Sequence, residues 1–262
     1  MSEQVINYQL TEEGIAIVTL NRPAALNAIN MEMKIELYRI MNEIAEDSHV
    51  KSVIITGEGR AFCAGGDVKE MNPTRNPIET RDRMKKYLLK TVLLITKMEK
   101  PVIMAVNGYA VGAGCNLALA GDIILASTKA VFSEIFVNVG LIPDAGGLYF
   151  LPRLVGLPKA KELIFRGSQI GAEEAERIGL VNYVVEHESL LDEAMTLAKE
   201  FANGPTKAIG VAKTMLNQSL EMDLETALDY EAMAQSVIGL TEDHKEGTRS
   251  FTEKRKPNFS GR

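Results

Sequence analysis

The chain has 262 residues, of which 46% are hydrophobic and 24% are charged, an ordinary mixture for a soluble globular protein. This composition excludes a collagen-like, coiled-coil or largely disordered chain. Its 29 Lys and Arg residues stand against 35 Asp and Glu residues, and the formal net charge of -6 argues against a general nucleic-acid binder.

The predicted elements begin with strands at residues 5–9 and 15–20, joined by a polar turn. The first ten residues lack the basic and apolar regions of a signal peptide. Apolar residues then recur at helical spacing over residues 31–47, and Asn30 is the expected N-cap of that helix. The chain therefore starts with a hairpin and an amphipathic helix.

Two buried strands, at residues 52–56 and 101–106, each run into a glycine-rich segment. The first segment, GEGRAFCAGGD, is expected to be neither helix nor strand, and the second is NGYAVGAGCNLALAGD. Residues 80–98 between them are predicted to form one basic amphipathic helix. A further strand, DIILAS, follows the second segment, so strands and helices alternate up to about residue 130.

Beyond Gly146 the patterns become helical, with one strand-like segment at residues 181–185. The helical patterns cover residues 157–167, 172–179, 188–203, 205–220, 222–240 and 243–255. Alternation followed by helices predicts an α/β layered core with mostly parallel strands and a helical appendage. We divide the chain into a core at residues 1–200 and a C-terminal helical region at residues 201–262.

Cysteine usage and hydropathy indicate where such a protein resides. Cys63 and Cys115 are too few for a disulfide framework, and no cluster at metal-ligand spacing surrounds them. The most apolar stretch, residues 101–126, is interrupted by polar residues and glycines, which excludes a membrane span there. We expect reduced thiols, no metal site, and a cytoplasmic protein without a membrane or nucleic-acid partner.

The two glycine-rich segments are candidates for an anion-binding site. Glycine permits unusual backbone angles and close approach of a ligand, and free N–H groups at a helix start favour a developing oxyanion. Two such loops side by side would offer two donors to one carbonyl oxygen; the alternative is that the glycines only make tight turns. Gly112-Ala-Gly114 fails the dinucleotide-binding pattern, because Leu117 stands where the third glycine belongs.

Taken together, five ordered segments resemble the crotonase superfamily, the enoyl-CoA hydratase/isomerase family of acyl-CoA enzymes. They are LNRPAALNAI (20–29), AFCAGGDVKEM (61–71), PVIMAVNGYAVGAGCNLALAGDIILAS (101–127), GLIPDAGG (140–147) and FTEKRKPNF (251–259). The resemblance implies an α/β fold, a crotonase-like spiral of ββα turns with a C-terminal helical trimerisation region. It also implies a homotrimer or dimer of trimers and an acyl-CoA substrate, with no separate cofactor because coenzyme A is part of the substrate.

The resemblance also places the thioester carbonyl oxygen between two backbone N–H groups, those of Gly66, which follows Gly65, and Ala113, which follows Gly112. Loss of an α-proton from a thioester gives an enolate whose charge falls on that oxygen. The implied contacts to coenzyme A are Arg22, Ala24, Ala25, Leu26, Ala64, Asp67, Val68, Lys69, Phe251 and Lys254.

Among these contacts, Arg22, Lys69 and Lys254 are chemically suited to phosphate, although without the resemblance each would be interpreted as a solvated surface cation. Phe251 and Lys254 of the last helix resemble residues that reach a coenzyme A held largely by a neighbouring subunit.

The two glutamates that hydratases of this family use are absent. The first belongs at Asn116 and the second at Phe136. Glu134 is nearby, but Phe132 and Gly140 fix the register, so we interpret it as a solvated or structural carboxylate, with a catalytic role as the alternative. Asn116 either orients the substrate or a water molecule, or is a buried amide at a helix start.

One acid remains in the matched motifs, Asp144 in IPDAGG. Family members with an acid here use it as proton carrier or nucleophile, and residues 139–147 are especially similar to the isomerases of phenylacetyl-CoA epoxide catabolism. The alternative is a helix N-cap. One carboxylate against an apolar wall that includes Phe136 suits proton transfer between two carbons, since burial raises its pKa and excludes water. We therefore expect an acyl-CoA isomerase.

Two other functions stay open. A 2-enoyl-CoA hydratase, equally a 3-hydroxyacyl-CoA dehydratase, would hold its water with Asp144 and Asn116, and a non-catalytic subunit would bind acyl-CoA without turnover. Tyr149 lies one helical turn after Asp144 and either touches the acyl group or packs in the core. The far end of the acyl pocket is expected to come from residues 71–95, which include Met71, Met84, Tyr87 and Leu88.

Overall fold

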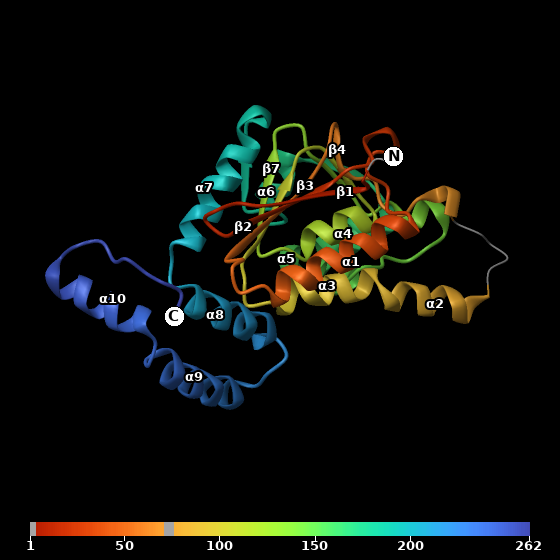
Figure 1. The fold of residues 1–262 in the computed structure, drawn as a ribbon. Helices are drawn as coiled ribbons and strands as arrows, with labels where there is room; N and C mark the ends of the chain where they lie inside the picture. Colours follow the sequence, from red (N-terminus) through yellow and green to blue (C-terminus); the bar gives the residue numbers. More distant parts are fainter. Residues whose placement is uncertain (1–3, 71–75) are drawn as a thin grey trace.

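The fold is described from a computed structural model that places residues 4–70 and 76–262, so the expected pocket residue Met71 lies outside the described residues. The chain builds two β-sheets (Figure 1). The larger sheet contains, in order, β1 (Ile6–Leu10), β2 (Ile15–Leu20), β3 (Ser52–Gly57), β5 (Val102–Val106), β7 (Ile123–Ser127) and β10 (Tyr183–Val185). The smaller sheet contains, in order, β4 (Ala61–Cys63), β6 (Tyr109–Val111), β8 (Val131–Ser133) and β9 (Gln169–Gly171).

The sheets arise from a repeated path of the chain. A strand of the larger sheet is followed by a strand of the smaller sheet and then by helix: β3 and β4 precede α3 (Leu88–Lys97), β5 and β6 precede α4 (Ala113–Leu119), and β7 and β8 precede α5 (Gly147–Arg166). Strands β3, β5 and β7 pair in parallel, as do β4, β6 and β8. The expected α/β spiral of ββα turns is therefore confirmed.

The central strands read as continuous apolar runs because both faces of the larger sheet are covered. Ile54 and Ile103 pack on one face against α7 (Leu190–Ala202). The alternate residues, such as Val53 and Met104, pack on the other face with α1 (Met31–Glu46) and α3. Asn30 caps α1 as predicted, since its side chain accepts a hydrogen bond from the amide of Met33 at 2.9 Å.

Two predicted segments are corrected by the structure. Residues 80–98 form two helices, α2 (Pro77–Lys86) and α3, because the backbone at Tyr87 leaves the helical region with φ -127° and ψ -73°. The α3 half buries Leu88 and Val92 against the core, whereas α2 has no buried residue. The glycine-rich segment after β3 contains strand β4, and β9 lies in the gap between the helical patterns predicted at residues 157–167 and 172–179. These three-residue strands are held by their neighbours, and they are too short to show a periodic pattern.

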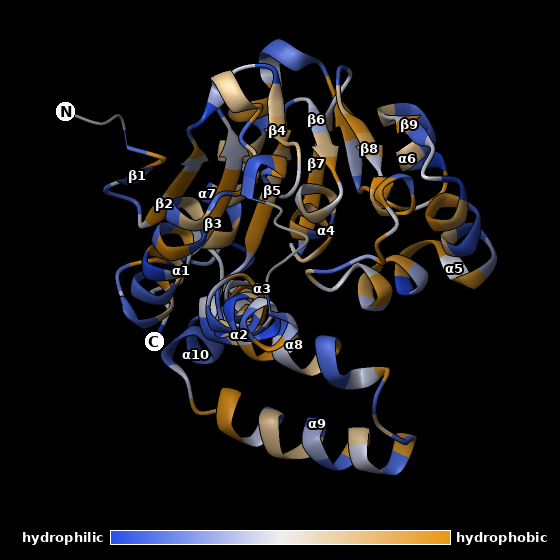
Figure 2. Cartoon of the chain, turned by 90° about the vertical axis from the view of Figure 1, so that its right-hand side faces the viewer, coloured by the Kyte–Doolittle hydropathy of each residue, from blue (hydrophilic) through white to orange (hydrophobic). Residues whose placement is uncertain are grey.

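The remaining elements are all helical. They are α6 (Ala172–Arg177), α8 (Thr206–Ser219), α9 (Leu224–Ile238), α10 (Glu242–Glu253) and 3-10 helices at Pro23–Ala25, Val68–Glu70, Ile135–Val139 and His187–Ser189. Figures 1 and 2 show α9 and α10 extending away from the sheets. The expected division at residue 200, which lies in α7, stays a prediction. In the placed part of the chain, every helix is too short or too polar to cross a bilayer.

Candidate active site

The two glycine-rich loops lie in direct contact. A Cβ atom added to Gly114 would lie 2.1 Å from the carbonyl oxygen of Cys63, and one added to Gly65 would lie 2.8 Å from that of Val111. Gly65 also has a φ of +91°, which favours glycine. The glycines therefore do more than make turns, because they allow the loop after β4 to pack on the loop after β6.

Two backbone N–H groups meet at this junction, those of Gly66 and Ala113. The position of a Cβ on Gly65, the residue before Gly66, is 3.5 Å from the nitrogen of Ala113. Ala113 precedes the first hydrogen bond of α4, which runs from the amide of Asn116 to the carbonyl of Gly112 at 3.0 Å. Across the described ranges neither N–H donates a hydrogen bond. Both donors are thus available to an anionic ligand at this junction.

Asp144 lies in the turn that precedes α5, and its backbone is fixed there. Its carbonyl oxygen accepts hydrogen bonds from the amide of Gly147 and from the side chain of Asn116, both at 2.9 Å. Ala145 and Gly146 follow with φ values of +47° and +91°. Gly146 is the N-cap of α5, without a side-chain cap, so the alternative that Asp144 caps this helix is wrong.

The carboxylate of Asp144 is only partly open to solvent. Its Oδ1 atom is buried and has no hydrogen-bond partner among the residues placed by the structure. Burial raises the pKa of Asp144, while the positive charge of Lys34 on α1 opposes this shift. Lys34 had no signal in the sequence, since it lies on the second turn of an ordinary amphipathic helix.

Phe136 gives the site an apolar wall. It is 8% exposed, and its ring lies 3.6 Å from the position that a Cβ on Gly112 would occupy. The aromatic ring thus covers the start of the loop that carries the Ala113 amide.

Asn116 agrees with the alternative of a buried amide at a helix start and not with the expected direct contact with substrate. It is fully buried, and its Nδ2 atom lies 2.9 Å from the carbonyl oxygen of Asp144 and 3.5 Å from Oε2 of Glu134. A Cβ on Gly147 would lie 2.3 Å from that Nδ2 atom, so the glycine leaves room for the amide. Asn116 thus holds the backbone of Asp144 through this hydrogen bond.

Glu134 is buried, so of the two interpretations given to it, the solvated carboxylate is wrong and the structural carboxylate remains. It is 2% exposed, and burial raises its pKa to about 7, with the negative charge of Asp144 acting in the same direction. Hydrogen bonds from Cys115 and Asn116 partly oppose that shift. No sequence pattern marks this carboxyl as buried, because the groups that enclose it come from α4.

The residues expected to contact coenzyme A tie the first two loops together. Both terminal nitrogens of Arg22 lie 3.1 Å from Oδ2 of Asp67, so this arginine forms an ion pair and is not a free surface cation. The amide of Ala64 donates to the carbonyl of Leu26 at 2.9 Å. Ala24 is exposed and Ala25 half-buried in the first loop, and Val68 and Lys69 are exposed in the second.

Asn27 organises the same region and was missed by the sequence analysis. It is fully buried, its side-chain oxygen accepts from the amide of Arg22 at 2.8 Å, and its side-chain nitrogen donates to the carbonyl of Ala61 at 2.7 Å. Leu26 and Asn27 have φ values of 51° and 55°. The available signal in the sequence was a single polar residue, Asn27, between apolar neighbours. Such a residue is typical of a buried side chain that hydrogen-bonds to the backbone.

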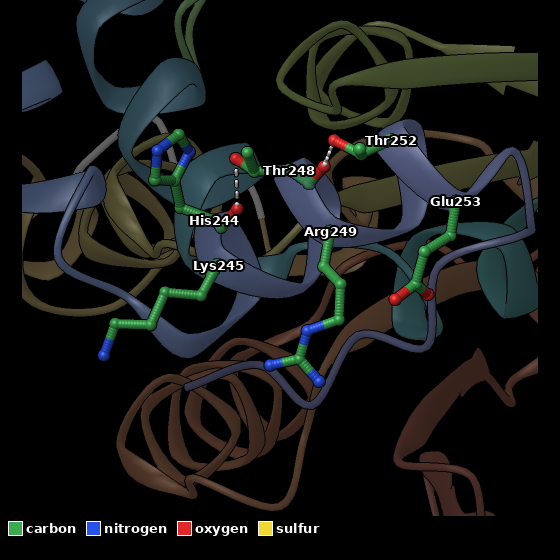
Figure 3. A pocket seen from close by; sticks show the side chains of 6 residues that line it. All are labelled: His244, Lys245, Thr248, Arg249, Thr252 and Glu253. Atoms are coloured by element: carbon green, nitrogen blue, oxygen red, sulfur yellow. Dashed lines mark hydrogen bonds between the residues drawn. The ribbon is translucent and has the colours of Figure 1, made fainter.

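Phe251 and Lys254 are not brought to this junction by the same chain. Figure 1 places α10 in the helical region that projects from the core, away from α4, and Phe251 is 87% exposed. A shallow hollow along α10 is lined by side chains of that helix alone (Figure 3), namely His244, Lys245, Thr248, Arg249, Thr252 and Glu253. None of these belongs to the junction of the two loops.

A larger, mostly apolar cavity of about 1140 Å³ lies between α3, α5 and α8. Tyr149 lines this cavity and is 40% exposed, and the guanidinium of Arg153 lies 3.6 Å from the centre of its ring. The alternative that Tyr149 packs in the core is therefore wrong. Leu89 and Leu93 of the expected stretch 71–95 also line this cavity, whereas Met84, Tyr87 and Leu88 do not.

Comparison with known proteins gives concordant matches. A family model described as enoyl-CoA hydratase/isomerase matches residues 10–262. The 1,2-epoxyphenylacetyl-CoA isomerase of Escherichia coli (strain K12) is 38% identical over 264 residues and covers 100% of both chains. The short-chain-enoyl-CoA hydratase of Clostridium acetobutylicum is 42% identical over 95% of this chain and 96% of its own. A crystal structure of enoyl-CoA hydratase from Bacillus anthracis superposes with a TM-score of 0.93 at 35% identity, over 99% of this chain and 100% of that one.

Proposed function

The chain belongs to the enoyl-CoA hydratase/isomerase family, and from that premise we propose that it is an acyl-CoA isomerase with Asp144 as the proton carrier. One observation carries the proposal: of the two carboxyls around the buried Asn116 amide, Asp144 is the partly open one, and Glu134 is enclosed. The positions of the two hydratase glutamates hold Asn116 and Phe136. A single accessible carboxylate suits proton transfer between two carbons of one substrate.

The reaction follows from the position of the charges. The N–H groups of Gly66 and Ala113 bind the thioester carbonyl oxygen of an acyl-CoA. Asp144 removes a proton from the α- or γ-carbon, and the electron pair of that C–H bond moves into the enolate oxygen held by the two amides. Asp144 then returns the proton to the other carbon, so the double bond migrates and no water is added.

The surroundings of Asp144 support this role. Its raised pKa makes its carboxylate a better proton acceptor than that of an ordinary aspartate. The Phe136 ring beside the oxyanion loop offers no hydrogen bond to a water molecule. The positive charge of Lys34 favours the ionised form of this carboxyl and so opposes part of the shift caused by burial.

Hydration of a 2-enoyl-CoA is the second candidate, favoured by the names of several relatives, such as the crotonyl-CoA hydratase of Syntrophomonas wolfei at 40% identity. It requires Asp144 and Asn116 to hold the attacking water. The complete burial of Asn116 speaks against that arrangement. A non-catalytic acyl-CoA-binding subunit is the third candidate, and it predicts binding without turnover.

We propose further that the protein is cytoplasmic and works as a homotrimer or a dimer of trimers. The apolar residues on α9 support assembly, since Leu224 is 75% exposed, Met233 69% and Val237 67%. In such an assembly Phe251 and Lys254 would reach the coenzyme A of a neighbouring subunit. Fatty acyl-CoA and phenylacetate-derived CoA esters are the substrate classes to be compared.

A product assay separates the three candidates. The protein is incubated with 2-enoyl-CoA and with 3-enoyl-CoA, and the products are identified by mass and by NMR. Interconversion of the two esters supports the isomerase. Accumulation of 3-hydroxyacyl-CoA supports the hydratase, and tight binding of both esters without turnover supports the binding subunit.

A further inference from the structure

The buried carboxyl of Glu134 has no part in the mechanism described above. It follows β8 directly, and the Asn116 amide and the Cys115 thiol of α4 face it. The thiol donates a hydrogen bond to the carboxyl, and Asn116 Nδ2 lies 3.5 Å from Oε2. Oε1 is buried without a partner in the part of the chain that the structure places. A carboxyl in such surroundings is costly to keep ionised.

Glu134 is connected to Asp144 through Asn116. The Nδ2 atom that approaches Glu134 also donates to the carbonyl oxygen of Asp144 at 2.9 Å. Around this amide, three buried oxygen acceptors lack a donor within the described residues: Oδ1 of Asn116, Oε1 of Glu134 and Oδ1 of Asp144. A proton on one of the carboxyls would supply a missing donor.

The charges around the cluster decide where that proton resides. Asp144 is the more open carboxyl, and the Lys34 ammonium of α1 favours its ionised form. Glu134 faces the Cys115 thiol, and the negative charge of Asp144 disfavours its ionised form. Two neighbouring carboxylates in one buried place do not both ionise readily. The proton therefore belongs on Glu134.

We propose that Glu134 is a positioning residue that holds one proton beside Asp144, so that the pair carries a single negative charge and this charge resides on Asp144. This inference rests on the proposed function, because it assigns Asp144 as the ionised proton acceptor. Because Glu134 is only 2% exposed, we assign it no contact with the substrate. It acts through the Asn116 amide and through its charge state.

The proposal makes the titrations of the two carboxyls interdependent. Loss of the Asp144 charge lowers the pH at which Glu134 gives up its proton, because a like charge has been removed. Conversely, ionisation of Glu134 places a second negative charge in the cluster and strengthens its hydrogen bond from the Asn116 amide.

The test reads the protonated carboxyl directly in the substrate-free, full-length protein. Infrared difference spectra follow the carbonyl stretch of a neutral carboxylic acid between about pH 5 and about pH 9, in the parent and in Glu134→Gln, Asp144→Asn and Glu12→Gln. Glu12 is an exposed carboxylate in the turn between β1 and β2 and serves as the matched control.

We expect a neutral-acid signal in the parent that disappears near neutral pH, is absent from Glu134→Gln and is unchanged in Glu12→Gln. In Asp144→Asn the signal should disappear at a lower pH than in the parent. A signal that persists in Glu134→Gln overturns the proposal. So does a titration of Glu134 that occurs at the same pH in Asp144→Asn as in the parent. The Asp144→Asn comparison retains this power even where Glu134→Gln does not fold.

The pH profile of kcat/KM supplies a readout that a purely structural role would not move. The parent profile should contain an ionisation near neutral pH that Glu134→Gln removes, while the acid-side ionisation of Asp144 remains. A uniform loss of rate at every pH, with both ionisations kept, contradicts the proposal. The spectra need no substrate, so the two proposals are tested separately. The proton on Glu134 can be demonstrated in a protein without isomerase activity, and isomerase activity can be found in a protein whose Glu134 is ionised.

Discussion

Replacing Glu134 with Gln should stabilise the fold above neutral pH and have little effect in mild acid. Burial raises the pKa of this carboxyl from 4.5 to about 7, so between these values the folded state holds a proton that the unfolded state has lost. The free energy of unfolding therefore falls as the pH rises through this window. The amide of Gln is neutral at every pH and still offers N–H donors to the cluster.

The size of the effect follows from the same two values. One pKa unit corresponds to about 1.4 kcal/mol, so the full displacement from 4.5 to about 7 amounts to about 3 kcal/mol. The stability of Glu134→Gln minus that of the parent should increase by this amount between about pH 4.5 and about pH 8. Asp144 titrates in both proteins, so its own contribution largely cancels in the difference.

The assay is urea-induced unfolding at several pH values, at one protein concentration, for the parent, Glu134→Gln and the exposed control Glu12→Gln. The control should follow the parent at every pH. A stability difference between Glu134→Gln and the parent that does not change with pH would refute the reasoning. A parent that is the more stable protein near pH 8 would refute it as well.

Three further predictions test other parts of the site. Gly114→Ala should destabilise the protein by about 1–3 kcal/mol and remove activity, because its Cβ would lie 2.1 Å from a carbonyl oxygen of the facing loop. The control Gly171→Ala, whose Cβ would have no atom within 4 Å, should be tolerated in thermal and activity assays. Arg22→Met should raise KM for acyl-CoA more than it lowers kcat, and a double-mutant cycle with Asp67→Asn should give a coupling energy of about 1 kcal/mol in unfolding experiments; additive effects would argue against the ion pair. Met233→Lys on α9, where Met233 is 69% exposed, should lower the oligomeric state measured by sedimentation, and an unchanged mass would contradict assembly through this face.

The elements that could be predicted from sequence are those whose local pattern and tertiary burial agree. The strands at Val53 and Met104 are apolar on both faces, so a continuous run was informative, and Asn30 caps α1 through atoms close in sequence. Tyr87 interrupts a pattern that otherwise continues, since α3 packs on the core and α2 does not. The short strand β4 exists because β6 lies beside it.

The candidate site was predictable where it consists of backbone and less so where it consists of buried side chains. The loops of Gly66 and Ala113 could be proposed from glycine patterns and the family resemblance. The burial of Glu134 depends on Asn116, which is 18 residues earlier in the chain and meets it through the packing of α4. Asp144 could be interpreted as a helix N-cap because aspartate is common at that position. The left-handed backbone at Ala145 moves the start of α5 to Gly146, so Asp144 does not cap it.

The measurement that tests the central claim most directly follows the double bond and the protons of 3-enoyl-CoA in deuterated water, with the parent and Asp144→Asn in parallel. We predict migration of the double bond with deuterium at the α- or γ-carbon in the parent. The variant should lose at least about 100-fold in rate while it still binds the ester, because a positioned acid–base group contributes about 10²–10⁴-fold. Accumulation of 3-hydroxyacyl-CoA by the parent, or undiminished migration in Asp144→Asn, would contradict the claim.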